Sequence, residues 1–164
     1  MISTLFGKTP FTLFHLVLSL VGILAGFVVL HGWLTARRRE HWTEVFLIST
    51  AATVITGFLF PIATITPAVG VGIASTVVLV VAIIARYWKH AAGHWRETYI
   101  VSALIALYLN SFVLVVQAFQ KVPALNALAP TGTEQPFALA QGLLLVFFIF
   151  AGFRSLQRYP MLPA

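Results

Sequence analysis

Cysteine and aspartate are both missing from this chain of 164 residues, and its only acidic residues are four glutamates. Without cysteine the chain has no disulfide, no thiolate metal site and no cysteine nucleophile. Without aspartate it has no Ser–His–Asp triad, and neither a Walker motif nor a close pair of carboxylates occurs in the sequence. We therefore expect a protein that is not an enzyme.

Charge is scarce and apolar residues are abundant, at 9% and 60% of the chain. The apolar residues form five runs, each near the roughly 17–25 residues that a membrane-spanning helix needs. The runs cover residues 11–34, 44–65, 69–87, 98–117 and 137–153. They predict an all-α integral membrane protein, a bundle of five transmembrane helices that forms a single domain over residues 1–164.

The lysines and arginines are distributed unevenly between the gaps separating these runs. Eight of the ten fall on one side of a five-span arrangement: Arg37, Arg38, Arg39, Arg86, Lys89, Arg96, Arg154 and Arg158. Only Lys8 and Lys121 fall on the other side. Loops rich in Lys and Arg stay cytoplasmic, which predicts an external N-terminus and a cytoplasmic C-terminus. The net charge of +6 thus lies at membrane ends, where it favours lipid headgroups and does not indicate a nucleic-acid partner.

A short repeat links the second and fourth runs. Residues 41–50 read HWTEVFLIST and residues 94–103 read HWRETYIVSA, with His, Trp, Glu, an aromatic residue and two aliphatic residues in register. This pattern predicts two helical hairpins that are tandem repeats of each other. The alternative is that interfacial Trp and a Glu in the first helical turn are favoured independently at both places.

Four histidines gather near the predicted cytoplasmic ends of the runs and form a candidate metal site: His31, His41, His90 and His94. Imidazole is a good ligand for zinc or iron, and His90 and His94 would share one face of a continuous helix. The His-Glu-x-x-His motif is absent, and polar residues are expected in such short loops in any case. Haem b would need two histidines at matching depth on different helices, and His15 alone lies well inside a run.

A second group of polar residues, which we call the outer polar set, lies deeper in the predicted membrane: His15, Tyr108, Asn110, Gln117 and Gln141. Such side chains face the interior of a bundle, because an unpaired amide in hydrocarbon is costly. They could join helices through hydrogen bonds, or they could line an outer-leaflet pocket for a quinone or a lipid headgroup. The sequence leaves both interpretations open.

Small and bulky residues predict how the helices pack. Gly22 and Gly26 form a Gly-x-x-x-Gly pair that allows two helix backbones to approach closely. The last run is bulky around its whole circumference, with Phe147, Phe148 and Phe150. It is typical of a helix that contacts lipid or docks against another membrane protein.

Several segments resemble one family of proteins: ARY at 85–87, GHWR at 93–96, ALYLN at 106–110, FVLVVQ at 112–117, KVPAL at 121–125 and LAPT at 128–131. The family is that of small, multi-spanning proteins of the bacterial inner membrane, and it carries no assigned activity. The resemblance implies a multi-pass protein of that membrane. It implies nothing about an activity.

Taken with the lack of reactive groups, these patterns favour a non-catalytic accessory or scaffolding subunit of a larger membrane complex, such as a respiratory or photosynthetic one. The expected partners are membrane lipids and other membrane subunits or further copies of the chain, with no resident cofactor. A redox protein that binds quinone or haem b is the first alternative. A small oligomeric channel or carrier is the second.

Overall fold

The computed structural model describes residues 10–60 and 67–159, and all regular structure in these ranges is helical. Its elements, in chain order, are α2 (Pro10–Leu34), α3 (Glu40–Phe58), α4 (Pro67–Ile83), the π-helical turn η1 (Ile84–Trp88), α5 (His94–Lys121), α6 (Pro123–Leu128) and α7 (Gln135–Arg158). The predicted all-α class is therefore confirmed. The connection after α5 contains the short helix α6.

Within the described ranges, four helices are long and apolar enough to cross a membrane: α2, α4 continued by η1 to Trp88, α5 and α7. They mark the chain as a multi-pass membrane protein. Helix α3 is not among the four, because Glu40, Glu44 and a series of Ser and Thr residues lower its mean hydropathy. The predicted run 44–65 is helical only as far as Phe58, and its residues 61–65 lie outside the described ranges.

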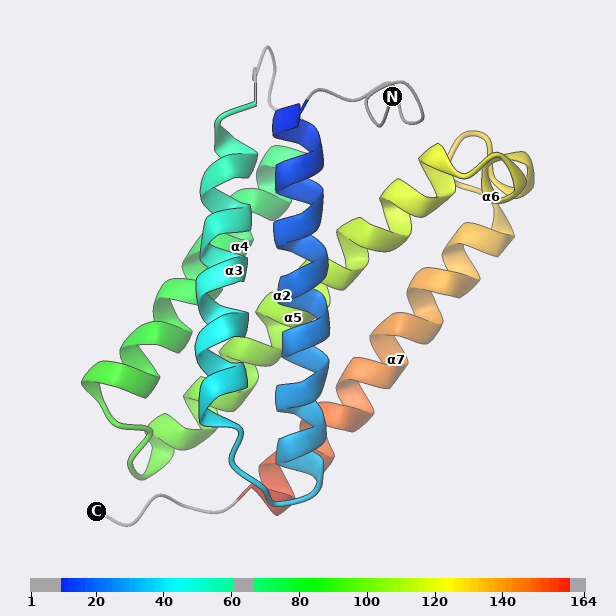
Figure 1. Ribbon diagram of the computed structural model, residues 1–164. Helices are drawn as coiled ribbons and strands as arrows, with labels where there is room; N and C mark the ends of the chain where they lie inside the picture. The colour runs from blue at the N-terminus through cyan, green and yellow to red at the C-terminus, as the bar shows by residue number, and fades with distance from the viewer. Residues whose placement is uncertain (1–9, 61–66, 160–164) are drawn as a thin grey trace.

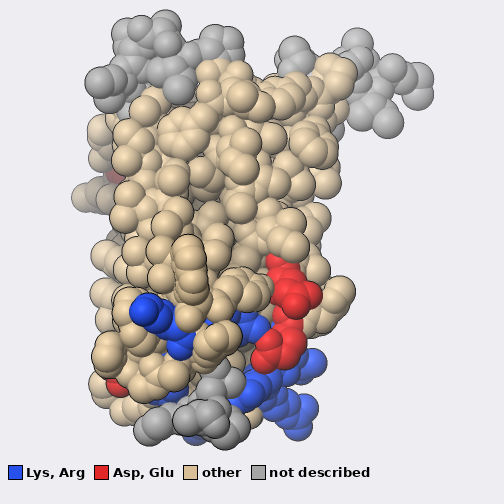
Figure 2. Space-filling model, turned by 90° about the vertical axis from the view of Figure 1, so that its left-hand side faces the viewer, with Lys and Arg blue, Asp and Glu red and all other residues tan. Residues whose placement is uncertain are grey.

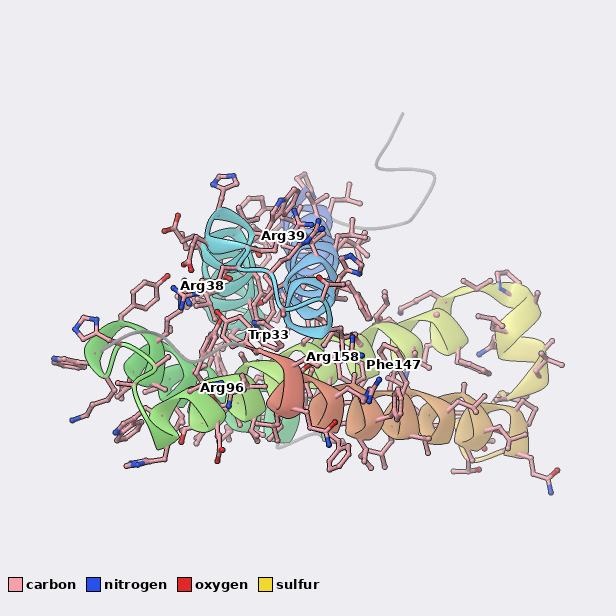
Figure 3. The ribbon with its side chains drawn as sticks, turned by 90° about the horizontal axis from the view of Figure 1, so that it is seen from below. Trp33, Arg38, Arg39, Arg96, Phe147 and Arg158 are labelled. Carbon is pink, nitrogen blue, oxygen red and sulfur yellow. The ribbon has the colours of Figure 1, made fainter. Side chains whose placement is uncertain are left out.

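The long helices run alternately up and down and form two layers (Figure 1). Seen from below, the α2–α3 hairpin lies on one side of a row made by α4, α5 and α7 (Figure 3). Helix α5 is in the middle of that row and contacts α2, α4 and α7. Accordingly, α5 has ten buried residues, whereas α7 has three.

Gly22 and Gly26 lie where α2 meets α3 and α5. A Cβ added at Gly26 would come within 2.5 Å of Leu107 Cδ1 and 3.0 Å of the Phe46 ring. At Gly22 it would lie 3.1 Å from Thr50 Oγ1. Only glycine fits at Gly26 without moving its neighbours, and this close approach is what the Gly-x-x-x-Gly pattern predicts.

Positive charge gathers at one end of the molecule, the lower end in Figure 2. This basic end consists of the connection 35–39, the connection 89–93 and the last turns of α7, with the first turns of α3 and α5 beside them. Lys121, at the last residue of α5, lies at the opposite end. For the described Lys and Arg residues, the alternating helices give the one-sided distribution that the sequence predicts, whereas Lys8 lies outside the described residues.

Candidate functional site

The interior of the bundle contains a seam of hydroxyl groups contributed by α3. Five of its buried residues are Ser or Thr: Thr43, Ser49, Thr50, Thr53 and Thr56. Most of these hydroxyls donate to a carbonyl oxygen one turn earlier, as Thr53 Oγ1 does to Ser49 O at 2.8 Å and Thr56 Oγ1 to Ala52 O at 2.7 Å. A hydroxyl that donates to a carbonyl one turn earlier keeps its oxygen lone pairs available to accept a further hydrogen bond.

His15 uses one of these lone pairs. Its Nδ1 lies 2.8 Å from Thr56 Oγ1, and its ring meets the Phe60 ring edge-on, with the ring centroids 5.2 Å apart. The Thr56 hydroxyl already donates to Ala52 O, so its oxygen accepts and His15 Nδ1–H donates. His15 therefore joins α2 to α3, and its bonding partner is not another member of the outer polar set.

Asn110 forms the equivalent link between α2 and α5. Its Oδ1 accepts a hydrogen bond from Ser19 Oγ at 2.8 Å. Its Nδ2 and the nearby Thr50 Oγ1 are buried and have no hydrogen-bond partner among the described residues. Both atoms lie beside Gly22, within 3.4 Å and 3.1 Å of the position a Cβ would take. A small polar node thus forms at the crossing of α2, α3 and α5.

The remaining members of the outer polar set lie apart from these two contacts. Gln141 Nε2 donates to Phe112 O at 3.3 Å and links α7 to α5, while Gln117 is exposed. Tyr108 packs its ring edge-on against Phe148, with the centroids 5.6 Å apart. In the described ranges no member of the set lines the surface hollow between α4 and α5 or the one between α2 and α3. The structure arranges His15, Asn110 and Gln141 as three separate interhelical contacts.

The four histidines of the candidate metal site, His31, His41, His90 and His94, are all exposed at the basic end. Among the residues that the structure describes, no three His or Glu side chains come close enough to hold a metal ion. His90 lies in the turn between η1 and α5, with a backbone φ of +52°, and α5 begins only at His94. His90 and His94 therefore do not share a helix face, because the continuous helix that this would require is interrupted between them.

The basic end contains a cluster of charged and aromatic residues that sequence reasoning missed. Arg86 forms an ion pair with Glu40 at the first residue of α3, and its guanidinium lies 5.3 Å from the centroid of the Tyr99 ring. Tyr99 is fully buried and meets the Trp33 ring edge-on, with the centroids 5.7 Å apart. The cluster thereby joins the ends of α2, α3, α4 and α5.

Arg96 extends this cluster to α7 (Figure 3). It is 8% exposed, and its Nε and Nη2 donate to Tyr159 O at 2.8 Å and Leu156 O at 2.7 Å. Burial raises the pKa of the Tyr159 phenol, whose ring packs on Trp33. In the repeat, Arg96 occupies the position of Thr43, so a charged residue replaces a hydroxyl at a buried position.

Comparison of the chain with protein-family models, with curated proteins and with solved structures found no match.

Proposed function

We propose that the chain is a non-catalytic accessory subunit of the bacterial inner membrane, which docks through α7 against a larger respiratory or photosynthetic complex. The observation that carries this proposal is the exposure of α7. It is 24 residues long, yet its buried residues are only Phe148, Ala151 and Ser155. Its exposed large residues include Leu139, Leu143, Val146, Phe147, Ile149, Phe150 and Phe153.

The free face of α7 combines features that suit another helix. Ala138 and Gly142 are exposed and four residues apart, and a Cβ at Gly142 would meet nothing within 4 Å. Small residues at this spacing allow a partner helix to approach closely. Phe150 and Phe153 on the same helix are 63% and 61% exposed, and they offer a large aromatic surface to such a partner helix.

We further propose that α3 is a fifth crossing, with the N-terminus outside and the C-terminus cytoplasmic. Its 19 residues extend about 28 Å at 1.5 Å per residue, close to the roughly 30 Å hydrocarbon thickness. Ser49 and Thr50 lie beside Gly22 of α2, and Thr56 bonds to His15. Ile48, Ile55 and Leu59 are exposed. A low mean hydropathy is compatible with a crossing when the polar side chains face the bundle interior.

The docking proposal is tested by native mass spectrometry after gentle extraction from the native membrane. We expect the wild-type chain to be retained with other membrane subunits, and Gly142→Leu to lose them. Gly70→Leu is the matched control, because a Cβ at Gly70 on α4 also meets nothing within 4 Å. A wild-type chain that is always extracted alone, or equal loss with both variants, would contradict docking through α7.

No specific contact favours the alternatives. A quinone or haem pocket would draw on His15, Asn110, Gln117 and Gln141, and three of these side chains are engaged in contacts between helices. An oligomeric channel would need a polar path, whereas the hydroxyls of α3 donate mostly to their own helix. The accessory function therefore remains the one best supported.

A further inference from the structure

Two shallow grooves lie on the outer surface of the bundle, one on each helical hairpin. Groove A, of about 400 Å³, lies between α4 and α5 and is lined on α5 by Glu97, Thr98, Val101, Ser102 and Ile105. Groove B, of about 310 Å³, lies between α2 and α3 and is lined on α3 by His41, Glu44, Val45, Ile48, Ser49 and Ala52. The opposite walls are apolar, with Val78 and Val81 in groove A and Leu18 in groove B.

The two grooves are made by equivalent positions of the repeat. Glu97 corresponds to Glu44 in the alignment of HWRE with HWTE, and the other four lining positions of α5 correspond in the same register to those of α3. The buried positions also coincide: Phe46 and Tyr99 are 1% and 0% exposed, and Ser49 and Ser102 are both 6% exposed. The sequence repeat is thus a repeat of local structure along the α3 and α5 walls of the two grooves, while His41 and Leu18 line groove B at positions whose repeat equivalents do not line groove A.

Each groove has an unpartnered carboxylate at one end. Of the four glutamates, Glu40 pairs with Arg86, and Glu134 accepts hydrogen bonds from Thr131 and Thr133. Within residues 10–60 and 67–159, Glu44 and Glu97 have neither an ion pair nor a hydrogen bond, and both are exposed. They lie in the first turns of α3 and α5, at the basic end and hence near the headgroup level of one leaflet.

The rest of each groove leads away from the carboxylate toward the middle of the membrane. From Glu97 to Ile105, and from Glu44 to Ala52, the helix advances about 12 Å. Along this length the lining is apolar apart from Thr98 and the two serines, whose hydroxyls donate back to their own helices. Each groove thus has an anionic group at the headgroup level and an apolar lining below it. These features complement an amphiphile with a cationic, hydrogen-bonding headgroup.

We propose that grooves A and B are equivalent binding sites for an ethanolamine phospholipid of the leaflet at the basic end. The ammonium of the lipid is held by Glu97 in groove A and by Glu44 in groove B, and one acyl chain lies along the apolar wall. The lipid phosphate faces the surrounding Lys and Arg side chains of the basic end. This binding is independent of what docks on α7, because neither groove includes a residue of α7.

Native mass spectrometry of the detergent-solubilised protein tests this proposal, with lipids of identical acyl chains but increasing N-methylation. Ethanolamine, monomethyl, dimethyl and choline headgroups keep the positive charge but lose N–H donors stepwise. We expect two retained ethanolamine lipids and about fivefold weaker retention of the choline lipid, the ratio for the loss of a hydrogen bond worth about 1 kcal/mol. Glu97→Gln and Glu44→Gln are each expected to remove one of the two. Glu134→Gln, at the opposite end of the molecule, is the matched control and should retain both.

Equal retention of all four headgroups by the wild-type protein would overturn the proposal, whether or not the variants fold. Retention of both ethanolamine lipids by the folded Glu44→Gln/Glu97→Gln double variant would also overturn it. A single retained lipid that only Glu97→Gln removes would overturn groove B as a site. None of these results depends on the accessory function, which is tested by the subunits that remain bound to α7.

Discussion

Arg96, in the first turn of α5, caps the carboxyl end of α7 by donating hydrogen bonds to the carbonyl oxygen of Tyr159. The last four carbonyl groups of a helix have no partner within the helix. Here a buried guanidinium from another helix supplies the partner and also reaches Leu156 O. The position of α7 against α5 therefore depends on this one side chain as well as on apolar packing.

Replacing Arg96 should release the end of α7. We expect Arg96→Met to lower the free energy of unfolding by about 2 kcal/mol, because it leaves buried carbonyl groups without donors. Arg96→Lys should recover only part of this loss, since an ammonium lacks the two-pronged geometry of guanidinium. The measurement is thermal unfolding in detergent, with Arg37→Met, at an exposed position, as the control. Equal stability of Arg96→Met and Arg37→Met would contradict the capping function.

Gly26 and Gly70 should respond oppositely to the same substitution. At Gly26 an added Cβ meets both Leu107 and the Phe46 ring, so we expect Gly26→Ala to destabilise the protein by about 1 kcal/mol. At Gly70 nothing lies within 4 Å, so Gly70→Ala should be neutral or stabilise α4 by up to about 1 kcal/mol. Unfolding midpoints of the two variants in the same detergent measure the difference. Destabilisation by both variants would argue against close packing as the cause.

The contact between Ser19 and Asn110 should couple α2 to α5. A double-mutant cycle with Ser19→Ala and Asn110→Leu is expected to give a coupling energy of about 0.6 kcal/mol, the average for hydrogen bonds between membrane helices. The pair Ser19 and Gln117 is the control, because Gln117 is exposed and should show no coupling to Ser19. Additive effects for Ser19 and Asn110 would contradict the hydrogen bond.

The connection before α7 should make stability depend on pH in the acid range. Its slight burial acts to raise the pKa of Glu134, but hydrogen bonds from Thr131 and Thr133 outweigh this and lower the pKa to about 2. A carboxyl group with a depressed pKa stabilises the folded state above its unfolded value of 4.5. That contribution is lost as the pH falls toward 2. We therefore expect unfolding midpoints to fall more steeply below pH 4.5 for the wild type than for Glu134→Gln.

Much of this fold follows from the sequence, because hydropathy alone locates long helices. The run 98–117, for example, lies inside α5, which extends from His94 to Lys121. The extra turns are polar and amphipathic, so they carry no hydropathy signal, although the helix continues through them. Helix α3 illustrates the reverse case: its buried threonines lower the hydropathy of a helix that packs along α2.

Side-chain partners were harder to predict than helices. His15, Gln117 and Gln141 agree in depth, and depth was the only criterion that the sequence offered. Contact also requires that the side chains face one another around their helix axes, and His15 faces Thr56 while Gln117 faces outward. The partners of Arg96 are backbone carbonyls, which leave no mark on the sequence. The close helix contact at Gly26 could be predicted, because it depends on the Gly-x-x-x-Gly spacing within a single helix.

The number of crossings can be decided with single cysteines, since the natural chain has none to interfere. Leu59, Ala92 and Ala127 are exposed positions after α3, after η1 and within α6. Five crossings with an external N-terminus predict that Leu59→Cys and Ala127→Cys react with an impermeant maleimide on intact spheroplasts. Ala92→Cys should then react only after permeabilisation.

If α3 does not cross and the N-terminus is outside, every one of these positions changes sides. Ala92→Cys would react on intact spheroplasts, and the other two only after permeabilisation. Such a result would also place the charges of the connection 89–93 outside, against the tendency of Lys and Arg to remain cytoplasmic. Because the five-crossing arrangement keeps Arg37, Arg86 and Lys89 on one side, we expect the first labelling pattern.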